Sequence, residues 1–414
     1  MKLTKSLTLG IALALGASGL ALTAPAMAKK AEKPAAGPNV QLSKEYRVAA
    51  SPISADVQAG KFDGIFPRLD ALASFQAPDE RFSTAQFRLA AARASNNDKE
   101  LRKAVVEMID SKSTLALATL PLLNSSAGEF ALAAKDYDEA NARFQEAIRL
   151  GSKNSAIFIN LAELNIRQKK YVDALPYAQQ AVNAEIAAGK KPPEAWYNRA
   201  VSVAYTAKIL PEAARWARMM VEQYPSPANW RTAVMTYRDS SKADGNLSLD
   251  LYRLLRVNKA LAGGRDFQEY AQLAGDRGLP GEAKSLIEEG MSSGALGREI
   301  RPINELLAIS AQKVPGDLAS LASSEKQANT AASGKTAAST ADAYLGYGQD
   351  AKAAALYRIA LQKGQVDADA VNTRLGIALA RQGMKAEAKQ AFGLVAGVRS
   401  EIAKFWVTWL DLKV

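Results

Sequence analysis

Three short segments contain residue types and spacings that carry chemistry in other proteins. Residues 290–294 read Gly-Met-Ser-Ser-Gly, the spacing that presents a serine nucleophile on a strand-to-helix turn. Residues 333–336 read Ser-Gly-Lys-Thr, like the end of a phosphate-binding loop. Residues 346–351 approach a dinucleotide-binding glycine pattern. These motifs need a neighbouring strand, whereas helical periodicity surrounds them here, so we interpret them as a helix ending in glycine, a loop and a turn between helices.

The composition excludes most catalytic chemistry. The 414 residues include no histidine and no cysteine, which excludes Ser-His catalysis, thiol nucleophiles, disulfides and iron–sulfur clusters. Most zinc sites are excluded for the same reason. Composition leaves carboxylate catalysis open, but no stretch outside the repeats described below is long enough for a separate catalytic domain. We therefore expect a protein that is not an enzyme and that needs no metal or cofactor.

The N-terminal 28 residues have the layout of a secretory signal peptide. Two lysines precede an apolar stretch from residue 7 to residue 22, and Ala26-Met27-Ala28 supplies small residues for a signal peptidase. The alternative, an uncleaved anchor, is disfavoured because the stretch is shorter than the ~20 residues that span a bilayer. We expect cleavage after Ala28 and a periplasmic protein. Residues 29–44, with two prolines and an excess of basic residues, are predicted to form a flexible linker.

The remainder of the chain repeats. Tyr137 and Tyr171 are 34 residues apart, and so are Ala140 and Ala174. A turn, acidic residues and an anchoring residue, mostly alanine, then recur about every 36 residues. The ten anchors are Ile65, Leu101, Ala140, Ala174, Ala213, Ser248, Ala283, Leu318, Ala353 and Ala388, of which Ile65, Leu101, Ser248 and Leu318 are assigned by spacing alone. The intervals from 101 to 140 and from 174 to 213 are longer, which predicts longer helices or loops there.

Each repeat is predicted to be a pair of antiparallel helices. A helix-period segment precedes the anchor and ends at glycine or lysine, as at Gly278 and Gly383. Acidic residues then begin the second helix, where the helix dipole favours negative charge. Small residues such as Gly128 and Gly376 face the anchor and let the two helices pack closely. Because one hairpin cannot bury its apolar face alone, the predicted fold is an all-α superhelix, or solenoid, of about ten stacked hairpins.

The segment from Gly128 to Ala147 resembles the tetratricopeptide repeat family, through Tyr137, Ala140 and Phe144. Residues 375–392 are similar to it as well, and the resemblance covers most of residues 45–399. Residues 326–341 are small and polar, which suits either a frayed helix end with a loop or a break between two arrays. Residues 400–414 place large apolar side chains on one helical face. This pattern favours a helix that caps the last hairpin, with a docking helix for another protein as the alternative.

The resemblance also implies where a partner would bind. Members of the family bind peptides or proteins on the concave surface, mostly through the first helix of each hairpin. The corresponding positions here are Asn160, Arg167, Tyr197, Asn198, Tyr205, Arg374 and Arg381. Asn160 and Asn198 occupy equivalent places in successive repeats, which suits a clamp on an extended backbone or a carboxylate. For any one of these residues, a merely solvated side chain is the alternative interpretation.

These observations predict a non-enzymatic scaffold that binds a partner protein or peptide in the bacterial cell envelope. The formal net charge of +11 favours an acidic partner and association with the envelope. Export makes nucleic acid an improbable partner, and no segment after the signal peptide is long and apolar enough to span a membrane. The second hypothesis is a binder of an anionic envelope glycan or small ligand. The third is a peptidoglycan-cutting enzyme that relies on a carboxylate.

Overall fold

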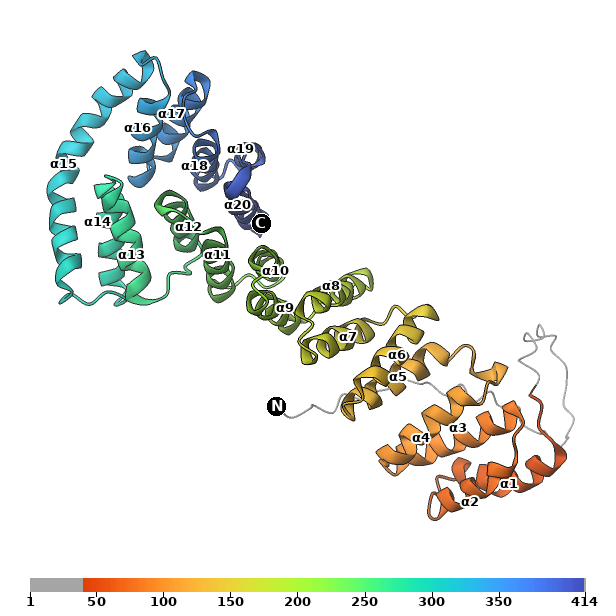
Figure 1. The fold of residues 1–414 in the computed structure, drawn as a ribbon. Coiled ribbons are helices and arrows are strands. Elements are labelled where there is room, and N and C mark those ends of the chain that lie inside the picture. The colour runs from red at the N-terminus through yellow and green to blue at the C-terminus, as the bar shows by residue number, and fades with distance from the viewer. Residues whose placement is uncertain (1–39, 413–414) are drawn as a thin grey trace, which may run out of the picture.

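The computed structural model describes residues 40–412, and every regular element within this range is a helix (Figure 1). The predicted signal peptide, most of the predicted linker at 29–44 and the last two residues of the predicted C-terminal helix lie outside the described residues. The first elements are α1 (Lys44–Gln58), α2 (Ile65–Ala71), η1 (Leu72–Ser74), α3 (Pro78–Ala94), α4 (Asp98–Asp110), η2 (Thr114–Ala116), α5 (Leu120–Ala133), α6 (Tyr137–Arg149), α7 (Ser155–Arg167), α8 (Tyr171–Ala187) and α9 (Glu194–Thr206). We call this part the N-terminal half.

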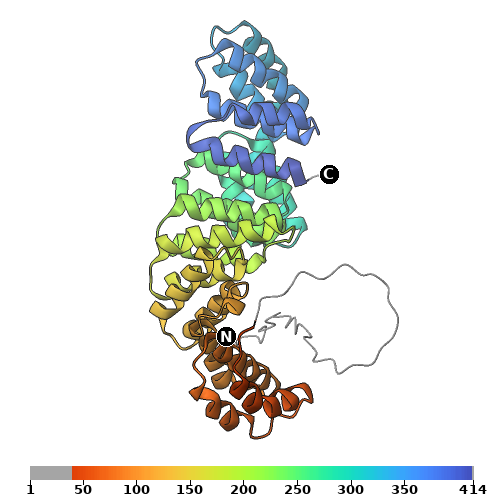
Figure 2. The same cartoon turned by 90° about the vertical axis from the view of Figure 1, so that its right-hand side faces the viewer.

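The C-terminal half continues the array. Its elements are α10 (Leu210–Gln223), α11 (Pro227–Ser241), α12 (Gly245–Val257), α13 (Gly263–Asp276), α14 (Pro280–Ser292), α15 (Arg301–Thr330), α16 (Lys335–Gly346), α17 (Asp350–Lys363), α18 (Ala368–Arg381), α19 (Lys385–Gly393), η3 (Gly397–Arg399) and α20 (Ser400–Leu412). Figure 2 shows the helices stacked one after another along the long axis of the molecule. The prediction of an all-α solenoid is confirmed.

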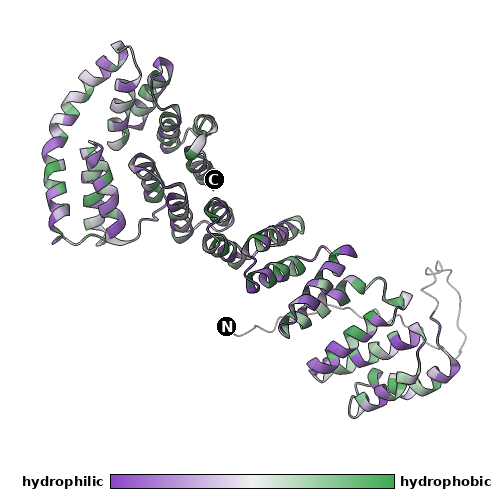
Figure 3. Ribbon diagram, viewed as in Figure 1, coloured by the Kyte–Doolittle hydropathy of each residue, from purple (hydrophilic) through white to green (hydrophobic). Residues whose placement is uncertain are grey.

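Neighbouring helices pair into hairpins. The pairs are α3/α4, α5/α6, α7/α8, α9/α10, α13/α14, α16/α17 and α18/α19. In α5/α6, the position where a Cβ on Gly128 would lie is only 2.6 Å from the Phe144 ring, so glycine is what lets the two helices approach. Gly376 meets Phe392 in the same way in α18/α19. The six alanine anchors are all buried, and Figure 3 shows hydrophobic and hydrophilic residues on every helix, as this one-sided packing requires.

The turn after each first helix contains one residue in the left-handed conformation, as the sequence pattern of lysine or glycine predicts. This residue is lysine at positions 135, 169 and 208, glycine at positions 278, 348 and 383, and asparagine at position 96 in α3/α4. A lysine there places its positive charge beside the unpaired carbonyl groups at the helix C-terminus, which the helix dipole favours. Gly348 lies in such a turn between α16 and α17, and Gly294, which also has a positive φ, follows the end of α14 at Ser292, in agreement with the interpretation of both motifs as helix ends and turns.

One expected hairpin is absent. The anchor assigned to Leu318 lies inside α15, a continuous helix of 30 residues, and the Leu318 side chain is 42% exposed. Pro315 and Gly316 therefore do not break the helix as the spacing suggested, because Pro315 lies on an exposed stretch, where water can bind the Ala311 carbonyl that loses its N–H donor. Residues 331–334 form a short turn to α16, and the apolar core continues across it from Leu321 to Ala337.

The C-terminal half closes on itself. Helix α20 returns to the beginning of this half and packs against α10 and α11 as well as α18 and α19 (Figure 1). The Phe405 ring contacts Trp230 and Tyr237 of α11 edge-on, and the Tyr237 hydroxyl donates to the carbonyl of Val398. Glu401 accepts a hydrogen bond of 2.7 Å from Arg218 of α10. The last helix therefore joins the two ends of the C-terminal half.

Helix α12 is enclosed by this arrangement. All nine residues from Leu247 to Leu255 are buried, so the helix has no face left for solvent or for a ligand. Tyr252 stacks on Tyr270 of α13, and Arg253 pairs with Glu282 of α14 at 2.6 Å. A helix that is buried on all sides is part of a core, here the centre of the C-terminal half.

The centre of the C-terminal half is held by a buried ionic network around Asp250 on α12. Its carboxylate lies 2.8 Å from Arg253, 3.2 Å from Arg374 of α18 and 2.7 Å from Arg399 of η3. Burial alone would raise the pKa of Asp250, but the charges of the three guanidinium groups outweigh it and lower the pKa to about 2. Burial likewise opposes ionisation of Glu282, yet Arg253 and the Tyr270 hydroxyl hold its pKa at about 2.

We predict that Gly128→Ala destabilises the protein by about 1–3 kcal/mol, because the added methyl group overlaps the Phe144 ring and overpacks the hairpin. The control is Gly316→Ala in α15, where nothing lies within 4 Å of the added Cβ. That change should stabilise the helix by up to about 1 kcal/mol. Urea unfolding followed by circular dichroism measures both, and equal effects would contradict the proposed glycine–aromatic packing.

We predict that Asp250→Asn destabilises the protein by about 3–5 kcal/mol, since it leaves buried guanidinium groups without their shared carboxylate. The matched control is Asp411→Asn, which removes a half-exposed carboxylate paired with Lys389 and should change stability by less than about 1 kcal/mol.

We also predict that the destabilisation caused by Asp250→Asn depends on pH. The pKa of Asp250 is lower in the folded protein than in the unfolded chain, so its contribution is present at neutral pH. The contribution is lost as the pH falls from about 4, the unfolded value, through about 2. The stability difference between wild type and Asp250→Asn should therefore narrow across this window, and a constant difference would rule out this account.

Candidate functional site

A groove of about 940 Å³ lies between α7, α8 and α9. Its floor is formed by Ala174, Leu175 and Ala178 of α8. The first helices of the two neighbouring hairpins, α7 and α9, form its walls, where Ile159 and Trp196 supply further apolar surface. A groove with an apolar floor and a few polar groups on its walls is the usual form of a binding site for a small ligand or a peptide.

The groove exists because α8 is long. Helix α8 has 17 residues, whereas α6 and α7 have 13 each, and residues 188–193 connect it to α9. This agrees with the longer helix or loop predicted from the interval between 174 and 213. The floor residues Ala174, Leu175 and Ala178 are themselves 1–6% exposed, so the groove is narrow above them.

The groove brings together three of the seven residues predicted to bind a partner. Asn160 and Arg167 line it from α7, and Asn198 lines it from α9. The side chains of Asn160 and Asn198 make no hydrogen bond within residues 40–412, so their amide groups are free to bind a ligand. Tyr205 is 48% exposed near the end of α9 but does not line the groove.

Tyr197 is a correction to the prediction. It is only 1% exposed and packs edge-on against Trp216 and Tyr224. Burial is the main cause that raises the pKa of its hydroxyl to about 12, and the neighbouring Tyr224 and Glu222 contribute less. Tyr197 is buried because α10, the second helix of its own hairpin, packs against α9 and brings Trp216 and Tyr224 onto the ring, which turns a groove position into a core position. It is therefore not available to a partner.

Arg374 and Arg381 are also corrections, because both are engaged inside the C-terminal half. The Arg374 guanidinium is bound by Asp250 and by Asp342, the latter at 2.7 Å. Burial alone would lower the pKa of Arg374, but the charges of these two carboxylates outweigh it and raise the pKa. Arg381 lies 3.7 Å from Asp350 and donates to the carbonyl of Leu345. Their charges complete an internal network rather than a binding surface.

Sequence reasoning missed two charged residues of the groove, Glu163 on α7 and Arg199 on α9. Arg199 donates to Glu163 at 3.1 Å, across the groove from one hairpin to the next. Arg167 also pairs with Glu163, at 3.3 Å. The 36 residues between Glu163 and Arg199 match the repeat period. Two residues of opposite charge that lie one repeat period apart could therefore have predicted this ion pair between neighbouring first helices.

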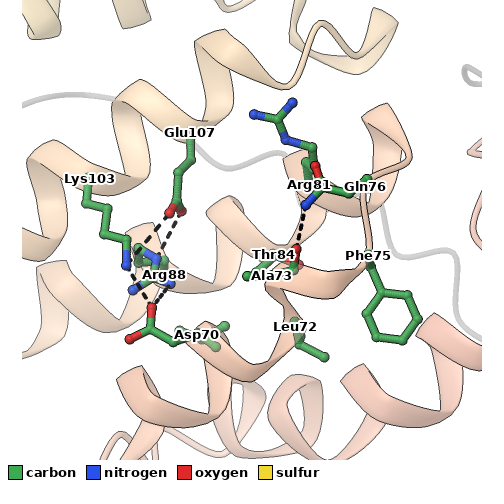
Figure 4. Close-up of a pocket in the computed structure, with 11 residues that line it drawn as sticks. Asp70, Leu72, Ala73, Phe75, Gln76, Arg81, Thr84, Arg88, Lys103 and Glu107 are labelled. Carbon is green, nitrogen blue, oxygen red and sulfur yellow. Dashed lines mark hydrogen bonds and ion pairs between the residues drawn. The ribbon is translucent and has the colours of Figure 1, made fainter.

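A second, smaller pocket of about 220 Å³ lies between α2, α3 and α4 (Figure 4). Arg88 lies at its base with 2% exposure and is bound by three carboxylates, those of Asp70, Glu100 and Glu107. Burial opposes the charge on Arg88, but Glu100 and Asp70 raise its pKa overall. Because the guanidinium is already fully engaged, we assign this network to joining α2, α3 and α4 rather than to ligand binding.

Membrane-spanning helices and metal-binding groups were two further possibilities. Between residues 40 and 412, no helix is long and apolar enough to cross a membrane. Over the same range, no group of three or more histidine, cysteine, aspartate or glutamate residues is arranged to hold a metal ion.

No protein-family model matches the chain, and no curated protein matches it either. Among solved structures, a tetratricopeptide repeat protein from Parabacteroides merdae is 15% identical, with 71% of this chain and 99% of that chain covered and a TM-score of 0.27. The APC/C hetero-tetramer Cut9-Hcn1 gives 12% identity, coverage of 88% and 63% and a TM-score of 0.23. The P58(IPK) TPR domain is 12% identical, with 82% of this chain and 89% of that chain covered and a TM-score of 0.23. Scores this low leave the α7–α9 groove to be judged on its own chemistry.

Proposed function

We propose that this protein is a non-enzymatic scaffold of the bacterial cell envelope that binds a segment of a partner protein in the α7–α9 groove. The observation that carries the proposal is the pair of free amide groups, Asn160 and Asn198, placed on neighbouring first helices above an apolar floor. An amide side chain can both donate and accept hydrogen bonds. Two of them in successive repeats match the alternating donors and acceptors of an extended backbone.

The apolar floor supplies the second half of the recognition. A large apolar side chain of the partner would be buried against Leu175 and Ile159, with Trp196 at the edge. Burial of apolar surface contributes affinity, while the asparagine side chains fix the direction and register of the bound segment. In the C-terminal half, α12 fills the centre, and the cavity of about 470 Å³ between α10, α19 and α20 is half the volume of the α7–α9 groove.

The cell-envelope location rests on residues 1–28, whose basic start, apolar stretch and Ala-Met-Ala ending are typical of a cleaved secretory signal. The absence of cysteine is compatible with an oxidising compartment, since no thiol is present to form an unwanted disulfide. The formal net charge of +11 favours acidic partners in this environment.

We predict that the double variant Asn160→Ala/Asn198→Ala loses partner capture from a crosslinked periplasmic extract by about tenfold, since each lost hydrogen bond contributes about 0.5–1.5 kcal/mol. The matched control is Asn141→Ala/Asn183→Ala, which changes two exposed asparagines on the second helices α6 and α8. Capture by the control should equal that of the wild type. Retention of only glycan by the wild-type protein would favour the binder of an envelope glycan instead.

We predict that the exported protein begins at Lys29, because Ala26 and Ala28 are the small residues next to the expected cleavage site. Cell fractionation followed by mass spectrometry of the intact protein and its N-terminal peptide measures this directly. Recovery of the full-length chain in the cytoplasm would refute the export part of the proposal and leave the groove untouched.

A further inference from the structure

Three charged side chains meet at the wall of the α7–α9 groove. Glu163 lies between Arg167 on its own helix and Arg199 on α9, at 3.3 Å and 3.1 Å. The two guanidinium groups are about half exposed, at 45% and 49%, and the carboxylate is 33% exposed. One carboxylate thus serves two arginines that come from different hairpins.

The chemistry of this cluster leaves a positive charge and unused donors. Each guanidinium presents five N–H donors, whereas a single carboxylate cannot engage more than a part of the ten. Among the residues that line the groove, Glu163, Arg167 and Arg199 are the charged ones, so the lining has one positive charge in excess. Two guanidinium groups converging on one oxygen pair form a site for a carboxylate.

We infer that Glu163 is a specificity-determining residue that occupies, as an internal ligand, the carboxylate position of the groove. This inference rests on the proposed function and deepens it, because it names the partner segment as acidic. A glutamate or aspartate of the partner replaces Glu163 between Arg167 and Arg199, while its apolar neighbour fills the floor near Leu175. Segments without a carboxylate leave Glu163 in place and gain nothing from the two arginines.

The exposure of the cluster makes the exchange feasible. Ion pairs between half-exposed side chains are weak, because solvent screens them and long side chains lose freedom when they pair. A partner carboxylate delivered by a bound segment therefore competes on favourable terms with Glu163. Glu163 discriminates against neutral and basic segments at the same time, since removing its charge from the arginines requires another anion.

The test uses the full-length exported chain and two fluorescein-labelled hexapeptide probes, Leu-Glu-Ser-Leu-Glu-Ser and its counterpart with glutamine in place of glutamate. Glu163→Gln should raise the affinity for the acidic probe by about three- to tenfold, the effect of one unit charge near 4 Å in a solvated site. Its affinity for the glutamine probe should stay unchanged, and 1 M salt should remove the gain. Arg199→Gln should weaken binding of the acidic probe.

The matched control is Glu139→Gln on α6, which removes an exposed glutamate paired with Arg143 at 2.6 Å, away from the groove, and should leave both affinities unchanged. Unchanged or reduced affinity of Glu163→Gln for the acidic probe, or no binding of this probe at all, overturns the inference. If that happens while Asn160→Ala/Asn198→Ala still abolishes partner capture, the proposed function survives alone. If Glu163→Gln behaves as expected but the asparagine variant captures normally, the carboxylate site stands and the proposed clamp falls.

Discussion

The buried carboxylate of Asp250 is the interaction on which the closed C-terminal half depends. It binds Arg374 and Arg399, which lie 124 and 149 residues further along the chain, together with Arg253 on its own helix. A buried charge is unfavourable unless partners of opposite charge surround it in good geometry. These partners come together only when α18 and η3 lie against α12. The buried charge of Asp250 is therefore compensated only when the C-terminal half has closed correctly.

The closure decides which part of the array remains open. One apolar cluster extends from Ala162 of α7 through α8, α9 and the whole C-terminal half to Leu410, and α12 occupies the centre of that half. Within the described residues of the N-terminal half, the core is divided into separate clusters around α1–α2, α3–α5 and α5–α7. The α7–α9 groove lies where these two regimes meet. The single run of hairpins therefore has one end with a continuous core and one end with a divided core.

The sequence predicted the contacts that are local and missed those that are distant. Gly128, Ala140 and Phe144 belong to one hairpin, so their spacing alone indicated how they pack. The groove residues Asn160 and Asn198 were found because equivalent positions recur with the repeat. Tyr197 and Arg374 looked equally suitable, yet Tyr197 is covered by Trp216 of α10 and Arg374 is bound by the distant Asp250, and the repeat spacing indicated neither contact. The continuous helix at Leu318 was missed for a related reason. The spacing between repeats predicts how many residues a repeat contains, but it does not predict whether a turn divides them into two helices.

The contact between Arg218 and Glu401 spans 183 residues of sequence, which has a consequence for how the chain folds. Hairpins such as α5/α6 join residues that are close along the chain, so they can form while later segments are still unstructured. Closing a loop of this length costs more conformational entropy than closing one hairpin, and contacts between distant residues slow folding. The N-terminal half can therefore acquire its structure progressively, whereas the C-terminal half must wait until its last helix is available. The bridge between Glu163 and Arg199 in the α7–α9 groove spans only 36 residues, so it belongs to the local contacts that can form early.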